Sequence, residues 1–262
     1  MNPYSDIRKV PLDYNGIKSS AFSVQMDKGD KWKEVGVVGN SYMLLPNQEV
    51  KDAADQVVQE CDLEFTHDKT FFNGKNYMYS LKSDHIAGTI KAGDDVALGV
   101  QFWNSYDGSR SFGFSMMLYR LVCTNGMMSK NYFNVFRFKH EPTNDNWEES
   151  LEQVVGNINA LSEGSAKIDE FISNLRKLNS LKITTEKLGD IRHKHLTDIP
   201  TGTWGQIVDK FTKPQLIEKD DYYSGWDLLN ASTDILWHKE NPTVASYNQN
   251  QIIVDGLCKA VA

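Results

Sequence analysis

The sequence predicts an α+β protein with a central antiparallel β-sheet built from hairpins, flanked by helices, and a helical C-terminal part. Asn73-Gly74 and Asp107-Gly108 each stand between runs of aromatic and β-branched residues. This is a strong hairpin signal, because glycine accepts the positive φ that such turns need. After residue 146 the apolar residues recur at helical spacing instead. We therefore divide the chain into an N-terminal extended arm (1–34), an α+β core domain of sheet plus long helix (35–178) and a mostly helical region packed on that core (179–262).

The composition is that of a globular protein. The chain has 262 residues, of which 40% are hydrophobic and 24% are charged. No apolar run approaches the roughly 20 residues that cross a bilayer, and the first residues lack the apolar segment of a signal peptide, so we expect no membrane contact. The three cysteines are far apart and odd in number, which argues against a disulfide framework and for the cytoplasm.

Turn and helix signals organise the first 61 residues. Asn15-Gly16 and residues 28–30 mark turns in the arm, which we expect to hold one short strand at 21–25. A strand interrupted by glycine follows at 35–45, and a helix at about 47–61, whose apolar residues keep the spacing of one helical face. Gly36 and Gly39 invite a phosphate-loop interpretation, but the full glycine fingerprint and a following Lys-Ser/Thr are missing.

Two hairpins and a short strand form the predicted sheet. The first hairpin spans 63–81, a loop follows at 84–95, and the central hairpin spans 96–123. Asp94 and Asp95 in the loop would point apart on an extended chain, and no third metal ligand accompanies them. In the strand 135–140, alternation places Arg137 and Lys139 on the face opposite the phenylalanines.

Helical spacing dominates the remainder of the chain. We expect one long helix or two between 146 and 178, a short helix at 204–211, a helix at about 225–238 and a final short helix at 251–261. His193 and His195, in the basic stretch 179–200, would share a face on a strand, but they make only half of a zinc site. We therefore expect no metal and no cofactor.

Charge is distributed unevenly along the chain. The formal net charge is −7, yet residues 101–140 contain five basic residues and one acidic residue, and residues 141–172 contain one basic and eight acidic residues. A local basic surface can bind phosphates despite a negative total. The alternative is that the two segments neutralise each other across the fold or an oligomer interface.

Basic residues stand beside aromatic residues in both hairpins. A surface for single-stranded nucleic acid needs this combination, because cations hold phosphates and rings stack on bases. The alternative is an ordinary β core with a solvated lysine tip. On the first interpretation, the phosphate contacts are Lys69, Lys75, Arg110, Arg120, Lys130, Arg137 and Lys139, and the stacking residues are Tyr77, Tyr79, Trp103 and Tyr106.

Four stretches together resemble the phage/plasmid-like family catalogued as a domain of unknown function (number 932). They are residues 35–42, 104–109, 120–125 and 226–238, of which the Asp-Gly-Ser turn and the following Arg-x-Val-Cys-x-Asn are the most specific. This resemblance implies a phage or mobile-element origin and no particular activity. The order of helix, antiparallel hairpins and long helix is also similar to phage single-strand annealing proteins, which implies an oligomer that holds single-stranded DNA along a basic groove.

The first functional hypothesis is a phage or mobile-element protein that binds single-stranded DNA in annealing or recombination, as a homo-oligomer in the host cytoplasm. The alternative is a non-enzymatic accessory or inhibitor of a host protein, because the acidic surface suits a basic partner. An enzyme is the third: we find no nucleophile with a base, no paired carboxylates, no Walker loop and no closed metal set. Cys123 could be a reactive thiolate, but a buried inert thiol is common at the end of an apolar strand.

Overall fold

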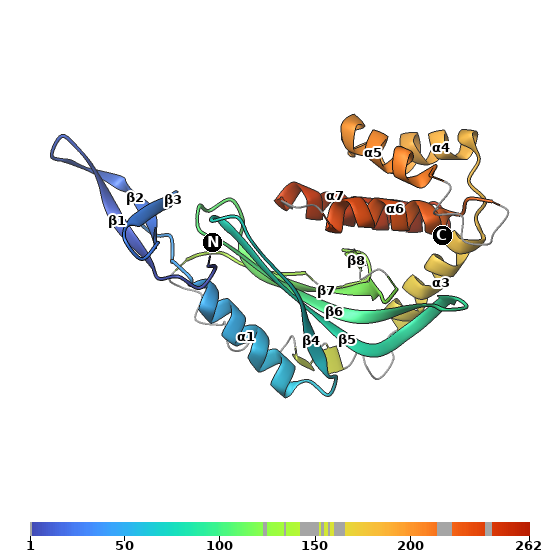
Figure 1. Cartoon of the computed structure of the whole chain (residues 1–262), viewed down its shortest axis with the longest axis horizontal. Helices are drawn as coiled ribbons and strands as arrows, with labels where there is room; N and C mark the ends of the chain where they lie inside the picture. Colours follow the sequence, from blue (N-terminus) through green and yellow to red (C-terminus); the bar gives the residue numbers. More distant parts are fainter. Residues whose placement is uncertain are drawn as a thin grey trace. The chain divides into compact units, whose positions relative to one another are not determined.

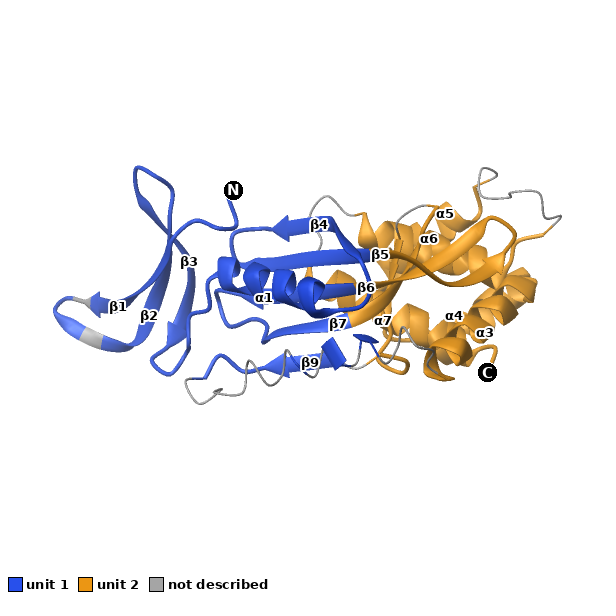
Figure 2. Ribbon diagram, turned by 90° about the horizontal axis from the view of Figure 1, so that it is seen from below, with its two compact units in different colours: residues 1–82, 100–115, 135–160 blue, residues 83–99, 116–134, 161–262 orange. Residues whose placement is uncertain are grey.

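The protein is α+β, as predicted, with antiparallel sheets and a helical C-terminal region (Figure 1). The computed structural model describes residues 2–122, 125–133, 135–141, 152, 155–156, 158–159, 166–213, 222–238 and 243–262. The chain forms two compact units (Figure 2). Unit 1 consists of residues 1–82, 100–115 and 135–160, and unit 2 of residues 83–99, 116–134 and 161–262. These units cut across the three segments that we derived from the sequence.

A three-stranded antiparallel sheet in unit 1 replaces the expected N-terminal arm. Its strands are β1 (Ile7–Tyr14), β2 (Ile17–Asp27) and β3 (Trp32–Gly39), in the order β1-β2-β3. The expected turns are present, and Gly16 and Gly29 have φ values of 81° and 86°. The expectation of a single short strand was wrong. Polar residues interrupt the apolar pattern of this segment and hide its strands in the sequence, although Val24 and Met26 of β2 are fully buried.

The second sheet has six strands: five follow the order β4-β5-β6-β7-β8, and the sixth, β9, pairs with β7. Both predicted hairpins are confirmed. The strands are β4 (Phe65–Phe72), β5 (Asn76–Lys91), β6 (Asp94–Ser105), β7 (Phe112–Arg120), β8 (Asn125–Met127) and β9 (Val135–Phe138). The loop expected at 84–95 is instead the end of β5 and the start of β6, joined at Gly93, where φ is 77°. In β6 every residue from Val96 to Ser105 is buried, so neither face of this part of the strand is exposed to solvent.

Helix α1 (Asn47–Glu60) of unit 1 confirms the predicted helix. Its buried side consists of Asn47, Val50, Ala53, Ala54 and Val57. The Asn47 backbone N–H, which has no partner within the helix, donates to the Tyr106 hydroxyl at 2.9 Å. Figure 2 shows α1 over the unit 1 part of β5 and β6. This bond fixes the start of α1 to the end of β6.

Unit 2 contains the helical C-terminal region. Its helices are α3 (Ala166–Ser180), α4 (Thr185–His195), α5 (Thr201–Phe211), α6 (Gly225–Trp237) and α7 (Val244–Lys259). Helix α3 confirms the second part of the apolar stripe expected over 146–178, and most of the first part lies outside the described residues. Helix α4 was not predicted because only Ile191 in it is buried, which leaves no apolar stripe to detect. Among the described residues, no helix is long and apolar enough to span a bilayer.

Candidate functional site

The four aromatic residues expected to stack on bases lie in the core. Tyr77, Trp103 and Tyr106 are at most 1% exposed, and Tyr79 is 6% exposed. The Tyr77 hydroxyl lies 3.1 Å from the Tyr4 hydroxyl, within unit 1. A ring can stack on a base only where its face is open, so the expectation that these rings are available for stacking is corrected. The alternative interpretation, an ordinary β core beside a lysine tip, describes these four residues.

Arg120 forms a buried ion pair with Asp94. Within unit 2 its Nε and Nη2 atoms donate to the Asp94 carboxylate at 2.6 and 2.7 Å, and Trp226 Nε1 donates to the same carboxylate at 2.8 Å. The Arg120 and Asp94 side chains are only 11% and 3% exposed. The expectation that Arg120 contacts phosphates is therefore corrected: a buried carboxylate needs a cation, and Arg120 supplies it.

The other basic residues expected to bind phosphates differ in how exposed they are. Lys69 is half-buried, and this burial lowers its pKa. Lys75 is exposed, with its Nζ 3.8 Å from Asp107 Oδ2 in unit 1. Arg137 of unit 1 and Lys130 of unit 2 are exposed. Their role in binding stays a prediction.

Arg110 and Lys139 come together at one hollow of unit 1, which we call the cationic pocket. Its volume is about 330 Å³, and three segments supply its lining: the turn after β3, the turn between β6 and β7, and the residues after β9. The lining residues are Gly39, Ser41, Tyr42, Gly108, Arg110, Ser111, Lys139, His140 and Glu141. Two of the stretches that resemble the family, 35–42 and 104–109, thus meet at this pocket.

Close backbone packing holds these segments in place. A Cβ on Gly36 would lie 2.6 Å from the Tyr106 carbonyl oxygen and 2.7 Å from Asp107 Cα, so only glycine lets β3 approach the turn. The Tyr42 hydroxyl donates to the Ser105 carbonyl at 2.6 Å. Gly36 therefore serves strand packing, and the phosphate-loop interpretation of this glycine is unnecessary.

The two cations of the pocket are held differently. The Arg110 guanidinium lies over the Trp103 ring, with Cζ 4.3 Å from the ring centroid. A guanidinium that stacks on a buried ring keeps its N–H groups in a fixed plane. Lys139 Nζ lies 3.8 Å from Glu141 Oε1, and both side chains are largely exposed, at 79% and 52%. Such an exposed ion pair contributes little to stability.

His140 closes one side of the pocket and was not predicted as a site residue. Its ring stacks on Tyr42 with centroids 4.4 Å apart, and its Nδ1 lies 2.9 Å from the Met43 carbonyl oxygen. Because a carbonyl only accepts, Nδ1 carries the proton. Burial lowers the pKa of His140, so the ring is neutral near pH 7 and Nε2 is an acceptor. Nε2 is buried and has no hydrogen-bond partner among the described residues.

A second hollow of unit 1, which we call the apolar cavity, shares residues with the cationic pocket. Its volume is about 230 Å³, and Lys139 and His140 line both. The other lining residues are Met43, Leu45, Glu49, Phe112 and Phe138. Burial, and secondarily the nearby Asp52, raises the pKa of Glu49. The cationic pocket and an apolar cavity with one carboxylate thus lie side by side.

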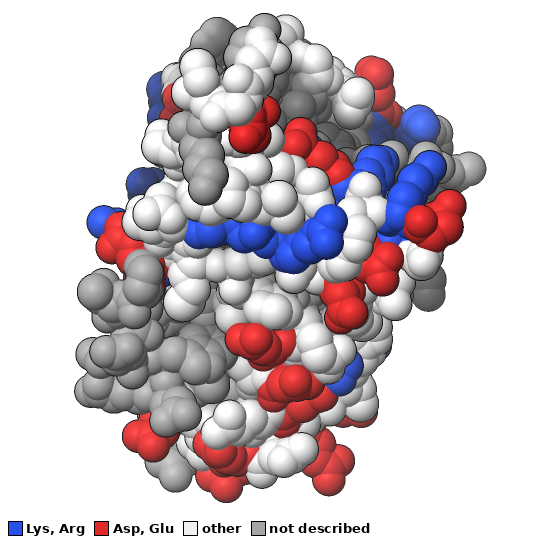
Figure 3. Space-filling model, turned by 90° about the vertical axis from the view of Figure 1, so that its left-hand side faces the viewer, with Lys and Arg blue, Asp and Glu red and all other residues white. Residues whose placement is uncertain are grey.

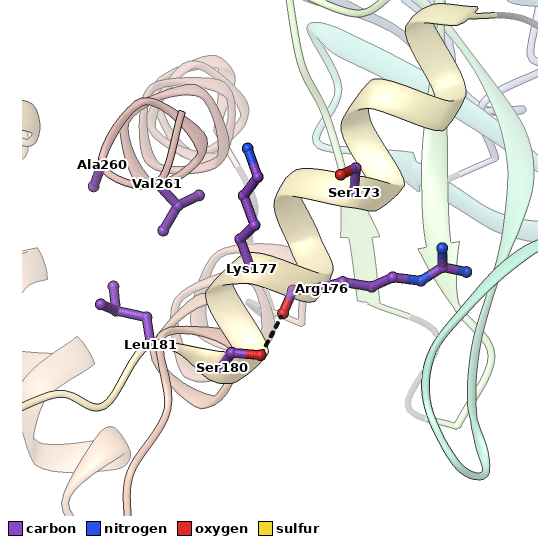
Figure 4. A pocket seen from close by; sticks show the side chains of 7 residues that line it. All are labelled: Ser173, Arg176, Lys177, Ser180, Leu181, Ala260 and Val261. Carbon is purple, nitrogen blue, oxygen red and sulfur yellow. Dashed lines mark hydrogen bonds between the residues drawn. The ribbon is translucent and has the colours of Figure 1, made fainter.

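Unit 2 has a more open hollow of about 540 Å³ (Figure 4). Its cations already have protein acceptors: Arg176 Nε donates to the Thr89 carbonyl at 2.8 Å, and Lys177 Nζ donates to Asn174 Oδ1 at 3.2 Å. Figure 4 also shows the hydrogen bond that the Ser180 hydroxyl donates to the Arg176 carbonyl oxygen. We place the candidate site in unit 1 because residues 35–42 and 104–109, two of the stretches that resemble the family, meet at the cationic pocket.

Basic and acidic side chains lie beside each other on the face of the molecule that Figure 3 draws. Figure 3 shows a short band of Lys and Arg side chains, with Asp and Glu on the same face. On this face the acidic neighbours offset the field of the cations.

The sequence also raised a metal site at His193 and His195 and a reactive thiol at Cys123. No three His, Cys, Asp or Glu side chains in the described ranges group as a metal site. His193 and His195 lie on helix α4 and not on a strand, and side chains two apart on a helix do not face each other. Cys123 lies outside the described residues.

Comparison with known proteins places the chain in one family. Searches of curated proteins and of solved structures give no match. One family model, described as a domain of unknown function (DUF932), matches residues 34–253. This range is most of the chain, and it contains the stretches that form the cationic pocket. The chain therefore belongs to the DUF932 family.

Proposed function

We propose that this protein binds single-stranded DNA and that the cationic pocket of unit 1 holds a backbone phosphate. The observation that carries the proposal is the convergence of Arg110, from the turn between β6 and β7, and Lys139, which follows β9, on one hollow that Ser41 and Ser111 also line. Guanidinium, ammonium and hydroxyl groups are the usual donors to phosphate oxygens. The role in phage annealing or recombination that the sequence suggested is a further part of this proposal.

The dimensions of the pocket favour a single strand. A concave hollow of about 330 Å³ can surround one phosphate and its sugar, whereas a duplex presents its phosphates on a stiff convex surface. The Arg110 guanidinium, oriented by Trp103, can bind two oxygens of one phosphate. The exposed Lys75 and Arg137 of unit 1 would add weaker contacts along the strand.

A fluorescence-anisotropy titration tests this proposal. Labelled single-stranded and duplex oligonucleotides are titrated with protein at several salt concentrations. We expect tighter binding of the single strand, and binding that weakens with salt because phosphate contacts release counterions. The Arg110→Gln/Lys139→Gln variant removes two contacts, so the slope of log K against log salt should fall by about 1.4, at roughly 0.7 per contact on a single strand.

Lys194→Gln is the matched control. Lys194 is an exposed lysine of unit 2 that pairs with Asp190 at 3.1 Å and lies outside the pocket. It should leave the slope unchanged. Absence of binding at micromolar protein, or binding that does not respond to salt, would reject the proposal.

A protein partner is a second candidate, and the partner we propose is a second copy of this chain. Strand β3 ends its sheet and exposes two apolar side chains, Trp32 at 38% and Val37 at 49%. Exposed apolar residues on an edge strand favour pairing with another chain. Light scattering after size exclusion should give more than one chain per particle, and Val37→Lys should lower that number. A monomeric wild type excludes this candidate.

A further inference from the structure

We infer that the apolar cavity receives one unstacked guanine base of the strand whose phosphate lies in the cationic pocket. The inference rests on the proposed function and adds a base-specific subsite to it. It would give the protein a preference for strands that contain guanine, which phosphate contacts alone cannot provide, because phosphates carry no sequence information.

The position of the cavity suits a base. Because Lys139 and His140 line both hollows, a ligand in the cavity is directly beside an anion in the pocket. A nucleotide has this form, with a phosphate joined to a base through one sugar. At about 230 Å³ the cavity is smaller than the roughly 300–1,000 Å³ of sites for drug-sized ligands, so it suits a single ring system.

The walls of the cavity suit a flat aromatic ring. The rings of Phe112 and Phe138 are stacked with centroids 5.6 Å apart and an interplanar angle of 29°. Met43 is 38% exposed, so its flexible thioether can cover an entering ring. Aromatic and sulfur-containing walls of this kind bind single-stranded bases that have left their stack.

The polar groups of the cavity select among bases. Glu49 provides two carboxylate oxygens, which can accept from two adjacent N–H groups. The edge of guanine presents such a pair, N1–H and the N2 amino group, whereas thymine has one N–H and adenine and cytosine have one amino group. His140 Nε2 is a second acceptor, without a partner among the described residues, and Lys139 can donate to guanine O6 or N7.

The experiment compares oligothymidylates that differ at one central position. The position holds guanine, adenine or an abasic sugar, so that the number of phosphates is constant. We expect the guanine strand to bind about tenfold more tightly than the abasic strand, which is the effect of about 1.4 kcal/mol. Glu49→Gln should remove most of this difference while the binding of plain oligothymidylate is retained. Glu60→Gln, at the exposed end of the same helix, is the matched control and should retain the difference.

Titration with dGMP separates this inference from the proposed function. Salt-sensitive strand binding with equal affinity for guanine and abasic strands overturns the guanine subsite and leaves the proposed function in place. Binding of dGMP without binding of any strand supports the subsite and rejects strand binding. A guanine preference that survives Glu49→Gln overturns the role of the carboxylate. Failure of every probe rejects both.

Discussion

Replacing Arg120 by methionine should strongly destabilise unit 2. The change keeps most of the aliphatic volume but removes both hydrogen bonds, at 2.6 and 2.7 Å, from the Asp94 carboxylate. Asp94 is 3% exposed, so water cannot replace the lost cation, and the hydrogen bond that remains from Trp226 Nε1 comes from a neutral group, which does not compensate the charge. Removing one partner of a buried pair typically costs about 3–5 kcal/mol. By contrast, Lys194 and Asp190 form an ion pair whose side chains are 65% and 50% exposed.

Urea unfolding followed by far-ultraviolet circular dichroism measures this cost, because helices α3–α7 belong to unit 2. Arg120→Met should lower the midpoint by about 1 M or more, since m is roughly 1–3 kcal/mol/M. Lys194→Met should change the free energy of unfolding by under about 0.5 kcal/mol. Asp94→Asn/Arg120→Met should be more stable than Arg120→Met alone, because no buried charge is left unpaired. If Arg120→Met is as stable as Lys194→Met, the reasoning is refuted.

The remaining predictions concern packing, protonation and thiol reactivity. Gly36→Ala should cost about 1–3 kcal/mol in urea unfolding, because its Cβ would overlap the backbone of residues 106 and 107. Gly205→Ala, in helix α5 with open space around the added Cβ, should instead stabilise by about 0.4–1 kcal/mol; equal effects would contradict the contrast. The pKa of His140 is lowered from 6.5 by burial, so below pH 6.5 the unfolded chain binds more protons than the folded protein. The free energy of unfolding should therefore fall by up to about 1.4 kcal/mol per pH unit as the pH drops through this region. His140→Gln should flatten that pH profile, and an unchanged profile would assign the proton uptake to another group. Burial raises the pKa of Cys258 to about 12, so iodoacetamide at pH 8 should modify it only after unfolding; mass spectrometry that finds it modified in the native protein would contradict its burial.

The sequence by itself determined the fold class and most of the local structure. Gly74 and Gly108 adopt the positive φ values, 95° and 71°, that their turns require, so the two hairpins could be predicted from neighbouring residues alone. Helix α1 was predictable for a similar reason, since it buries one side of a regular helical pattern. Helix α6 was also predicted, although the structure buries residues on all of its sides. These features depend on interactions between residues close in the chain.

Tertiary structure decided which side chains are available for function. Alternation along a strand separates two faces, but it does not say whether the second face is also covered. Trp103, near the end of β6, and Tyr106, directly after it, are both buried, so the expected stacking surface does not exist there. The pairing of Arg120 with Asp94 is likewise a contact across 26 positions of the chain, which no local pattern records.

The candidate site depended most on tertiary structure. Arg110 and Lys139 were predicted as separate phosphate contacts, and only the fold brings them to one pocket with Ser41 and His140. Those residues come from three segments separated by tens of positions, and each segment alone is an ordinary turn or strand end. Sequence patterns report the periodicity of one element, whereas a binding site depends on which elements meet, and that is decided by packing.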